Sequence, residues 1–280
     1  MPLPSFLIKR TPKQKNIRLL RQKIGGSGIH TVCEEAHCPN IGECYSGGAC
    51  AFMILGDTCT RSCAFCGVKH GKPSLPDPNE PAQVANAAKK LGLKYVVVTS
   101  VTRDDLEDGG ASQFAATIRQ LRTTNCELRI EVLIPDFNGE RASLQTVIDA
   151  KPYVINHNLE TIERLYDKIR PQAIYRRSLE LLKTLKALKS DIYTKSGFMV
   201  GLGEKDGEVV STLNDLAQAG CDIVTIGQYL PPSRQHQKPE RYVSPEVFKQ
   251  WEDHGTKLGI TVAAGPFVRS SYRAENMVKK

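Results

Sequence analysis

The residues best suited to chemistry are seven of the nine cysteines, which lie in one short stretch between Cys33 and Cys66. Two triplets stand out by their spacing. One has the spacing C-x4-C-x5-C and the other C-x3-C-x2-C, and their members are Cys33, Cys38 and Cys44, then Cys59, Cys63 and Cys66. Structural zinc sites usually pair two C-x2-C knuckles, and no second knuckle accompanies the second triplet. Three thiolates in an eight-residue loop instead suit a cubane iron–sulfur cluster with one iron left open to another ligand.

The composition indicates an ordinary water-soluble chain in a reducing compartment. The sequence has 280 residues, 40% hydrophobic and 24% charged, with a net charge of +8. That charge favours acidic partners, although a solvated basic surface explains it equally well. No apolar run approaches the ~18 residues of a membrane span, and the basic N-terminal segment lacks the apolar core of a secretory signal. An odd number of crowded cysteines does not resemble a secreted disulfide scaffold. We therefore expect a cytoplasmic protein that does not bind a membrane.

An alternation of apolar runs and amphipathic segments predicts the fold. Expected strands cover residues 51–55, 95–100, 128–134, 153–156, 193–200 and 223–227, with a final strand-like run at 260–264. Expected helices cover residues 81–91, 110–122, 141–150, 162–165 with 175–188, 208–219 and 245–258. Strands rich in Val and Ile that alternate with helices are typical of a parallel sheet with both faces covered. Pro39, Gly42, Gly47 and Gly48 predict turns rather than a helix in the first cysteine stretch, 33–50.

The expected architecture is an α/β partial (β/α)6 barrel of the TIM-like kind. Six strands are too few for a closed eight-stranded barrel, and a doubly wound open sheet is the alternative. We expect three parts: an N-terminal extension (1–50), the barrel (51–240) and a C-terminal helix, strand and tail (241–280). Reactive groups in such barrels follow the strands. The polar residues at these positions are Thr99, Ser100 and Asp104; Asn156, His157 and Asn158; Lys195; Glu204; and Gln228 and Tyr229.

The motifs also carry a family resemblance. CTRSCAFC (59–66) resembles the cluster motif of radical S-adenosylmethionine enzymes, and the first triplet with FMILGDTCTR is similar to lipoyl synthases in particular. The resemblance spans nearly the whole chain, through VVVTSVTRDDLEDGGA (96–111), INHNLET (155–161), KSGFMVGLGE (195–204), QYLPP (228–232) and RSSY (269–272).

This resemblance implies two 4Fe–4S clusters. Cys59, Cys63 and Cys66 would hold the cluster whose open iron binds S-adenosylmethionine, which is cleaved to a 5′-deoxyadenosyl radical. Cys33, Cys38 and Cys44 would hold an auxiliary cluster that supplies sulfur. Its fourth ligand would be a serine of RSSY, and matching by position gives Ser271, with Ser270 the alternative. The implied reaction inserts sulfur at C6 and C8 of an octanoyl chain on a carrier lysine.

The resemblance also implies partners. These are octanoylated lipoyl-carrier domains, namely the acyltransferase subunits of 2-oxoacid dehydrogenases and the glycine cleavage H protein, and an electron donor such as ferredoxin or flavodoxin. No nucleic-acid partner is expected. The basic residues between Lys9 and Lys23 would help to recruit an acidic carrier.

Seven polar residues are expected to contact the cosubstrate: Thr99, Ser100, Asn156, Asn158, Arg170, Lys195 and Glu204. Each has a structural alternative, such as satisfied amides in a turn, a lysine that snorkels or an exposed arginine. Asp104 and Asp105 equally suit capping of the helix that follows. Cys50 is expected to be a small apolar residue rather than a ligand, and Cys126 and Cys221 are expected to lie in the core.

Two other functions compete with this one. A zinc-stabilised module could use the basic surface to bind nucleic acid, but the aromatic content is 6% and no stacking motif accompanies the basic segment. A radical sulfur insertase acting on another substrate, such as tRNA, would keep the cluster chemistry.

Overall fold

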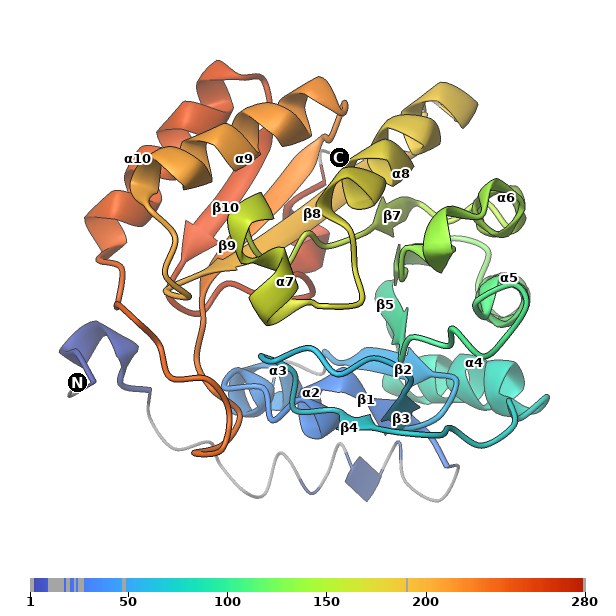
Figure 1. Ribbon diagram of the computed structural model, residues 1–280. Coiled ribbons are helices and arrows are strands. Elements are labelled where there is room, and N and C mark those ends of the chain that lie inside the picture. The colour runs from blue at the N-terminus through green and yellow to red at the C-terminus, as the bar shows by residue number, and fades with distance from the viewer. Residues whose placement is uncertain are drawn as a thin grey trace. The chain divides into compact units, whose positions relative to one another are not determined.

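The computed structural model describes residues 3–9, 18, 21, 22, 24, 28–46, 49–189 and 191–278 (Figure 1). The expected short helix near residues 17–23 lies largely outside them. The chain forms two compact units. The N-terminal unit comprises Thr11–Arg61 and Gly67–Ile155, and the C-terminal unit comprises Met1–Arg10, Ser62–Cys66 and Asn156–Lys280. The predicted three-part division concerns the roles of these segments and stays a prediction.

The N-terminal unit is built on parallel strands that follow chain order. Strand β2 (Ala51–Ile54) pairs in parallel with β5 (Tyr95–Ser100), which pairs in parallel with β6 (Arg129–Leu133). The short β1 (His30–Thr31) pairs antiparallel with β2. The helices that follow these strands are α4 (Glu80–Leu91), α5 (Ala111–Thr124) and α6 (Arg141–Asp149). All four central residues of β5 are buried, and three of them are valines.

Helix α4 shows how the sequence sets a boundary. Its buried face contains Val84, Ala85 and Ala88, and it ends at Gly92 with φ 64°. The Gly92 amide donates to the carbonyl oxygens of Ala88 and Lys89, which satisfies backbone groups that the helix leaves open. The predicted end of this helix is confirmed.

The C-terminal unit continues the same pattern. Strand β8 (Tyr193–Val200) pairs in parallel with β9 (Ile223–Gln228), and β9 pairs in parallel with β10 (Thr261–Gly265). Its longer helices are α8 (Tyr175–Leu188), α9 (Asp206–Gln218) and α10 (Pro245–Lys257), and Figure 1 shows α9 and α10 beside each other next to these strands. Shorter elements are η1 (Ser5–Leu7), η3 (Glu163–Leu165), α7 (Tyr166–Ile169) and η4 (Ala274–Asn276). The final strand-like run therefore extends the parallel sheet.

Within each unit, neighbouring parallel strands appear in chain order, whereas a doubly wound sheet reverses that order at its centre. The strand between the two sets is β7 (Val154–Asn156), and the division between the units falls after Ile155. The expected α/β strand–helix alternation is confirmed.

The prediction of turns at 33–50 was wrong for part of that stretch. Residues Val32–Glu35 form α2 and Ile41–Ser46 form α3. Pro39 falls between the two helices, and Gly42 lies in the first turn of α3, where the Cys44 amide donates to the Asn40 carbonyl oxygen. Pro39 and Gly42 thus lie at helix boundaries, where a glycine is tolerated because it costs only ~1 kcal/mol even inside a helix. Gly47 and Gly48 lie outside the described residues.

Candidate active site

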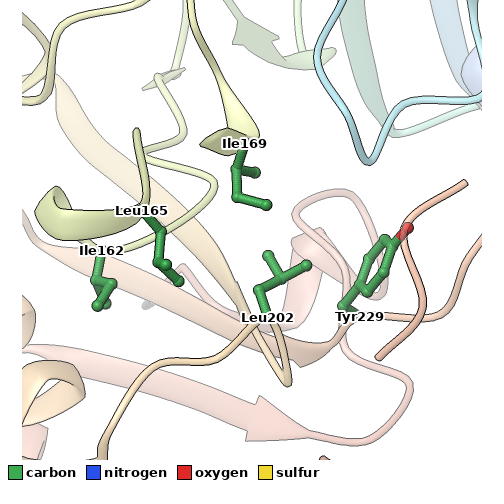
Figure 2. Close-up of a cluster of buried hydrophobic side chains, with 5 residues drawn as sticks. All are labelled: Ile162, Leu165, Ile169, Leu202 and Tyr229. Carbon is green, nitrogen blue, oxygen red and sulfur yellow. The ribbon is translucent and has the colours of Figure 1, made fainter. Parts of the chain in front are cut away.

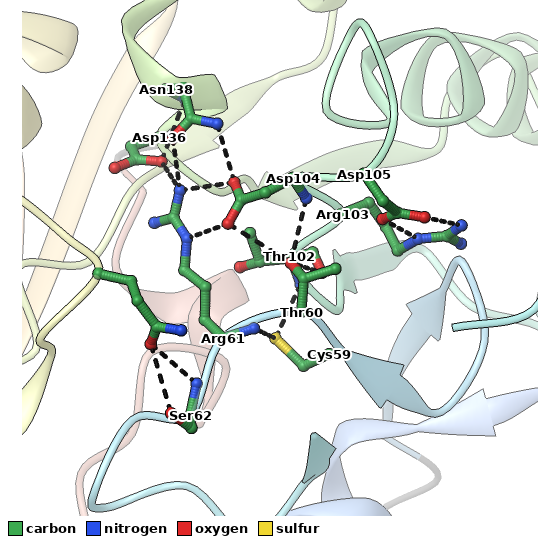
Figure 3. Close-up of polar contacts among 11 residues, drawn as sticks. Cys59, Thr60, Arg61, Ser62, Thr102, Arg103, Asp104, Asp105, Asp136 and Asn138 are labelled. Atoms are coloured by element: carbon green, nitrogen blue, oxygen red, sulfur yellow. Dashed lines mark hydrogen bonds and ion pairs between the residues drawn. The ribbon is translucent and has the colours of Figure 1, made fainter. Parts of the chain in front are cut away.

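The C-x3-C-x2-C loop leaves a short strand pair in the N-terminal unit. Strand β3 (Thr58–Cys59) pairs in parallel with β4 (Lys69–His70). The Sγ atom of Cys59 accepts hydrogen bonds from the Arg61 amide at 3.4 Å and the Thr102 amide at 3.3 Å (Figure 3). These two amides fix the position of a sulfur that could bind iron.

Arg61 anchors this end of the loop. Its guanidinium donates to the carboxylate of Asp104 at 2.7 and 2.8 Å, to Asp136 at 2.7 Å and to Asn138 at 2.9 Å (Figure 3). Burial alone would lower the pKa of Arg61, but its hydrogen bonds with the two carboxylates raise that pKa above the ordinary value. Arg61 therefore stays cationic and holds the backbone next to Cys59.

The second half of the loop, Ser62–Cys66, is anchored within the C-terminal unit. The Ser62 amide donates to the side chain of Gln172 at 3.0 Å, and the Ala64 amide donates to the Ile169 carbonyl oxygen at 3.0 Å. His236 Nε2 lies 3.0 Å from the Cys66 carbonyl oxygen. Since a carbonyl oxygen only accepts, this ring nitrogen carries the proton.

An apolar cluster supports the same half of the loop. Phe65 packs against five buried side chains drawn in Figure 2, which are Ile162, Leu165, Ile169, Leu202 and Tyr229. Phe65 lies between Ala64 and Cys66, so its packing and the two backbone hydrogen bonds fix three consecutive residues. Hydrogen bonds and apolar packing therefore both fix the part of the loop that bears Cys63 and Cys66.

The other cysteine triplet lies on α2, α3 and their connection. Cys33 is buried, whereas Cys38 and Cys44 are half-buried, and none of the three is in a disulfide. The Cys38 amide donates to the Cys33 carbonyl oxygen at 3.0 Å, which closes the turn after α2. Burial raises the pKa of the Cys33 thiol to about 12. A thiol of this kind binds iron only by losing its proton, so binding here releases protons.

The remaining cysteines divide as their surroundings dictate. Cys50 and Cys221 are buried, as expected for small apolar residues. The expectation was wrong for Cys126, which is exposed because it lies in the turn between α5 and β6. In the part of the chain that the structure describes, no three His, Cys, Asp or Glu side chains gather as ligands of a single metal ion.

Two predicted cosubstrate contacts lie at the end of β5. The Thr99 hydroxyl donates to the Leu133 carbonyl oxygen at 3.0 Å and is buried in the sheet. The Ser100 hydroxyl is shielded from solvent and has no hydrogen-bond partner among the described residues. A shielded hydroxyl without a partner is costly unless a ligand or water completes it, so Ser100 fits a ligand-contacting role better than Thr99.

Three further candidates lie close together in the C-terminal unit. Arg170 Nη1 donates to the carbonyl oxygens of Asn158 at 2.9 Å and Leu159 at 3.1 Å. The fully buried Lys195 donates to the Ser270 carbonyl oxygen at 2.6 Å. The Ser270 hydroxyl donates to Asn158 Oδ1 at 2.9 Å. Lys195 and Asn158 thus contact the RSSY segment, while Asn156 is fully buried at the end of β7.

Other strand-end residues take structural roles. The Glu204 carboxylate accepts from the amides of Gly201 and Leu202 at 2.8 and 2.9 Å and pairs with Arg241. This arrangement does not favour ribose binding by Glu204, which stays a prediction. Gln228 bonds three carbonyl oxygens and one amide, and the Tyr229 hydroxyl donates to the Gln237 carbonyl oxygen. His157 lies 2.9 Å from the Ser178 hydroxyl.

The capping alternative for Asp104 and Asp105 was wrong. The Asp108 carboxylate accepts from the Gly110 and Ser112 amides at the start of α5. Asp104 binds Arg61, and Asp105 binds the buried Arg103.

Sequence reasoning missed the residues that hold the cluster loop. Arg61 carried a signal, because it lies between two expected ligands, and Asp136 and Asn138 directly follow an expected strand. His236 carried none, since a histidine 170 residues from Cys66 has no spacing relationship with it.

Comparisons with known proteins agree with the class that this loop and fold define. A family model described as "Radical SAM superfamily" matches residues 53–228. Among solved structures, Streptococcus suis SuiB bound to S-adenosylmethionine has a TM-score of 0.59 at 10% identity and covers 76% of this chain and 49% of its own. Methylornithine synthase (PylB) has a TM-score of 0.55 at 13% identity, and the match covers 92% of this chain and 80% of its own. These likenesses show the TIM-like fold, and the protein is a radical SAM protein.

Closer relatives narrow the assignment. Lipoyl synthase of Alkaliphilus metalliredigens is 51% identical over 99% of this chain and 96% of its own length. Lipoyl synthase of Caldicellulosiruptor bescii is 55% identical over 98% of this chain and 94% of its own. The chain belongs to the lipoyl synthase family.

Proposed function

We propose that this enzyme inserts sulfur at C6 and C8 of an octanoyl chain that is amide-linked to a lysine of a carrier protein, and so forms the lipoyl group. The observation that carries the proposal is the presence of both cysteine triplets and RSSY in a chain about half identical to lipoyl synthases over nearly its full length. Sulfur insertion at an unactivated methylene needs hydrogen abstraction by a radical, which side chains cannot generate, so a cofactor is required.

The donor set around Cys59 fits an iron–sulfur cluster. Cys59, Cys63 and Cys66 would hold the cluster that binds S-adenosylmethionine. Two amides already donate to Cys59 Sγ, and backbone contacts fix the chain beside Cys63 and Cys66. The role of these residues is to keep three thiolates in one loop while leaving a position for the cosubstrate. The first cluster with S-adenosylmethionine, when bound, would supply a 5′-deoxyadenosyl radical, and the auxiliary cluster would supply the sulfur.

The second triplet is proposed to hold the auxiliary cluster, with Ser271 as its fourth ligand. Three cysteines without disulfides supply three thiolates, and a serine oxygen is a harder ligand that matches a soft iron–sulfur core poorly. A weak fourth ligand would help the cluster to give up sulfide. Ser271 would therefore favour the release of sulfide from the auxiliary cluster over its retention.

The cosubstrate contacts are proposed to include Ser100 and Asn156, with Arg170 holding the backbone at Asn158. Ser100 offers a shielded hydroxyl with no hydrogen-bond partner among the described residues. Arg170 donates to the Asn158 carbonyl oxygen, which fixes the chain directly after β7. These roles would orient the cosubstrate rather than supply chemistry.

The partners and setting complete the proposal. An octanoylated carrier domain is the substrate, ferredoxin or flavodoxin is the electron donor, and the enzyme acts in the cytoplasm. A basic chain with a net charge of +8 suits an acidic carrier. Among the described residues, no helix has the length and apolarity needed to cross a bilayer.

The deciding experiment is an anaerobic incubation with S-adenosylmethionine, a reductant and an octanoyllysine peptide. We expect a thiolated peptide followed by the dithiolane. The matched control replaces Cys33, Cys38 and Cys44 by alanine, which should abolish thiolation while 5′-deoxyadenosine still forms. Dithiolane formation by that triple variant would refute the proposed sulfur source.

A further inference from the structure

The C-terminal segment Val268–Ser270 lies directly against two strands of its own unit. A Cβ atom added to Gly227 on β9 would lie 2.2 Å from the Val268 carbonyl oxygen. A Cβ added to Gly197 on β8 would lie 2.3 Å from Thr225 Oγ1 and 3.1 Å from Ser270 Oγ. Both positions therefore require glycine: the segment fills the space next to Gly227, whereas Thr225 fills most of the space next to Gly197 and the Ser270 hydroxyl lies at its edge.

Two buried polar groups fix the segment in this space. The Lys195 ammonium donates to the Ser270 carbonyl oxygen at 2.6 Å, and the Ser270 hydroxyl donates to Asn158 Oδ1 at 2.9 Å. The Asn158 amide group in turn donates to the Glu160 carboxylate at 2.9 Å, which sets the orientation of its oxygen toward Ser270. Lys195 is fully buried, so its side chain depends on hydrogen bonds within the fold, and the bond to Ser270 is one of them.

The two serines of RSSY thus differ in their surroundings. Both the carbonyl oxygen and the hydroxyl of Ser270 are engaged by the sheet. A hydroxyl that donates to an asparagine within the fold is poorly placed to become a metal ligand. The next residue, Ser271, is half-buried and follows a rigidly held neighbour.

We propose that Lys195 and Asn158 are positioning residues, which hold Ser270 of the RSSY segment in place and so fix the backbone next to Ser271, the proposed ligand of the auxiliary cluster. This inference rests on the proposed function, because it assumes that cluster. Lys195 would therefore hold the segment that contains the proposed auxiliary-cluster ligand, and would not bind the carboxylate of S-adenosylmethionine. The hydrogen bond from the Lys195 ammonium to the Ser270 carbonyl oxygen fixes the backbone at the residue before the proposed ligand.

The test uses the full chain with Cys59, Cys63 and Cys66 changed to alanine, so that any cluster present is the auxiliary one. Lys195→Met keeps the length of the side chain and removes the donor. We expect about tenfold faster loss of one iron to a chelator, which is the scale of one charge-assisted hydrogen bond. We also expect an altered Mössbauer signal for the iron with the oxygen ligand. Lys195→Arg, which keeps a donor, should restore part of the retention.

The control is Lys249→Met on the exposed face of α10, where the ammonium forms surface ion pairs with Asp253 and Glu252. It should leave both readouts unchanged. Ser270→Ala, a smaller change, should loosen the iron while the oxygen-ligated signal persists, whereas Ser271→Ala should remove that signal.

Three results would overturn the inference. These are wild-type iron retention in both Lys195→Met and Ser270→Ala, loss of the oxygen-ligated signal in Ser270→Ala alone, or, in the chain that keeps all its cysteines, weaker S-adenosylmethionine binding by Lys195→Met with an unaltered auxiliary cluster. Failure of the proposed function would look different, since the parent with only the first triplet would then hold no cluster at all.

Discussion

The guanidinium of Arg61 lies 2.7 Å from the carboxylate of Asp136, and both side chains are almost completely buried. Arg61 is the middle residue between two proposed ligands, Cys59 and Cys63, so this ion pair fixes the loop at its centre. The guanidinium also donates to Asp104 and Asn138. A buried pair of this kind contributes to the shape of the loop as much as to stability.

Replacement of Arg61 by methionine should destabilise the protein strongly, because it leaves the buried Asp136 carboxylate without its counter-charge. We expect a loss of ~3–5 kcal/mol in the free energy of unfolding, measured by urea denaturation. Arg176→Met is the matched control, since Arg176 forms an exposed pair with Glu163 and should cost under ~1 kcal/mol. Equal effects of the two substitutions would contradict the anchoring role of Arg61.

Replacement of His236 by alanine should loosen the half of the loop that bears Cys63 and Cys66. The ring donates to the Cys66 carbonyl oxygen, and loss of this neutral hydrogen bond is worth ~1 kcal/mol. We expect faster loss of iron from the cluster on Cys59, Cys63 and Cys66 and a shifted reduction potential, measured by chelation and by redox titration. His236→Gln should recover part of the effect.

His254→Ala is the control for His236, because its ring contacts Asn214 between α10 and α9. It should alter neither the iron retention nor the potential. A His236→Ala protein with the wild-type potential and retention would show that the hydrogen bond to Cys66 is dispensable.

The ion pair of Glu208 with Arg164 predicts a defined pH dependence. Hydrogen bonding to Arg164 lowers the pKa of Glu208 to about 2. Because the folded-state pKa is below the unfolded value of ~4.3, the pair stabilises the protein above pH ~4.3, and this contribution is lost as the pH falls toward 2. Glu208→Gln should therefore cost up to ~1 kcal/mol at pH 7, the pair being solvent-screened, and progressively less below pH ~4.

Urea denaturation of wild type and Glu208→Gln at several pH values measures this difference. Glu180→Gln, on the exposed face of α8, serves as the control and should show no such pH-dependent gap. A gap that stays constant down to pH 3 would rule out ionisation of Glu208 as its cause.

Replacement of Ser271 by cysteine should separate radical formation from sulfur insertion. A thiolate matches the iron–sulfur core better than the serine oxygen and should retain the cluster too firmly. We expect 5′-deoxyadenosine to form at a rate close to wild type while thiolated peptide falls at least tenfold, measured by mass spectrometry, which corresponds to ~1.4 kcal/mol or more in barrier. Full sulfur insertion by this variant would exclude the weak-ligand explanation.

The strands and most helices were predictable because their signals are local. Valine-rich β5 had the local signal of a buried strand, and Gly92 marked the end of α4. The helices at 32–35 and 41–46 were not predicted, since glycine and proline at a helix boundary look the same in sequence as in a turn. The exposed Cys126 was missed because composition favours burial of cysteine whatever the loop around it.

The site was predictable only where its residues are close in sequence. The two cysteine triplets can be recognised from their spacing in the sequence, whereas the contact between His236 and Cys66 depends on tertiary structure. Lys195 was expected to contact the cosubstrate because it lies on a strand. Its hydrogen bond to Ser270, 75 residues away, could not be inferred from either local sequence.

The two glycines under the C-terminal segment set a practical limit on engineering. Glycine-to-alanine replacement commonly stabilises a protein by ~0.4–1 kcal/mol through the unfolded chain, and Gly207 in α9 is open to it, with no atom within 4 Å of the added carbon. The same replacement at Gly227 would push the tail away from the strand, and at Gly197 it would clash with Thr225 and crowd Ser270. A thermostable version of this enzyme should therefore be sought by changing exposed helix positions, while Gly197 and Gly227 are kept as glycine.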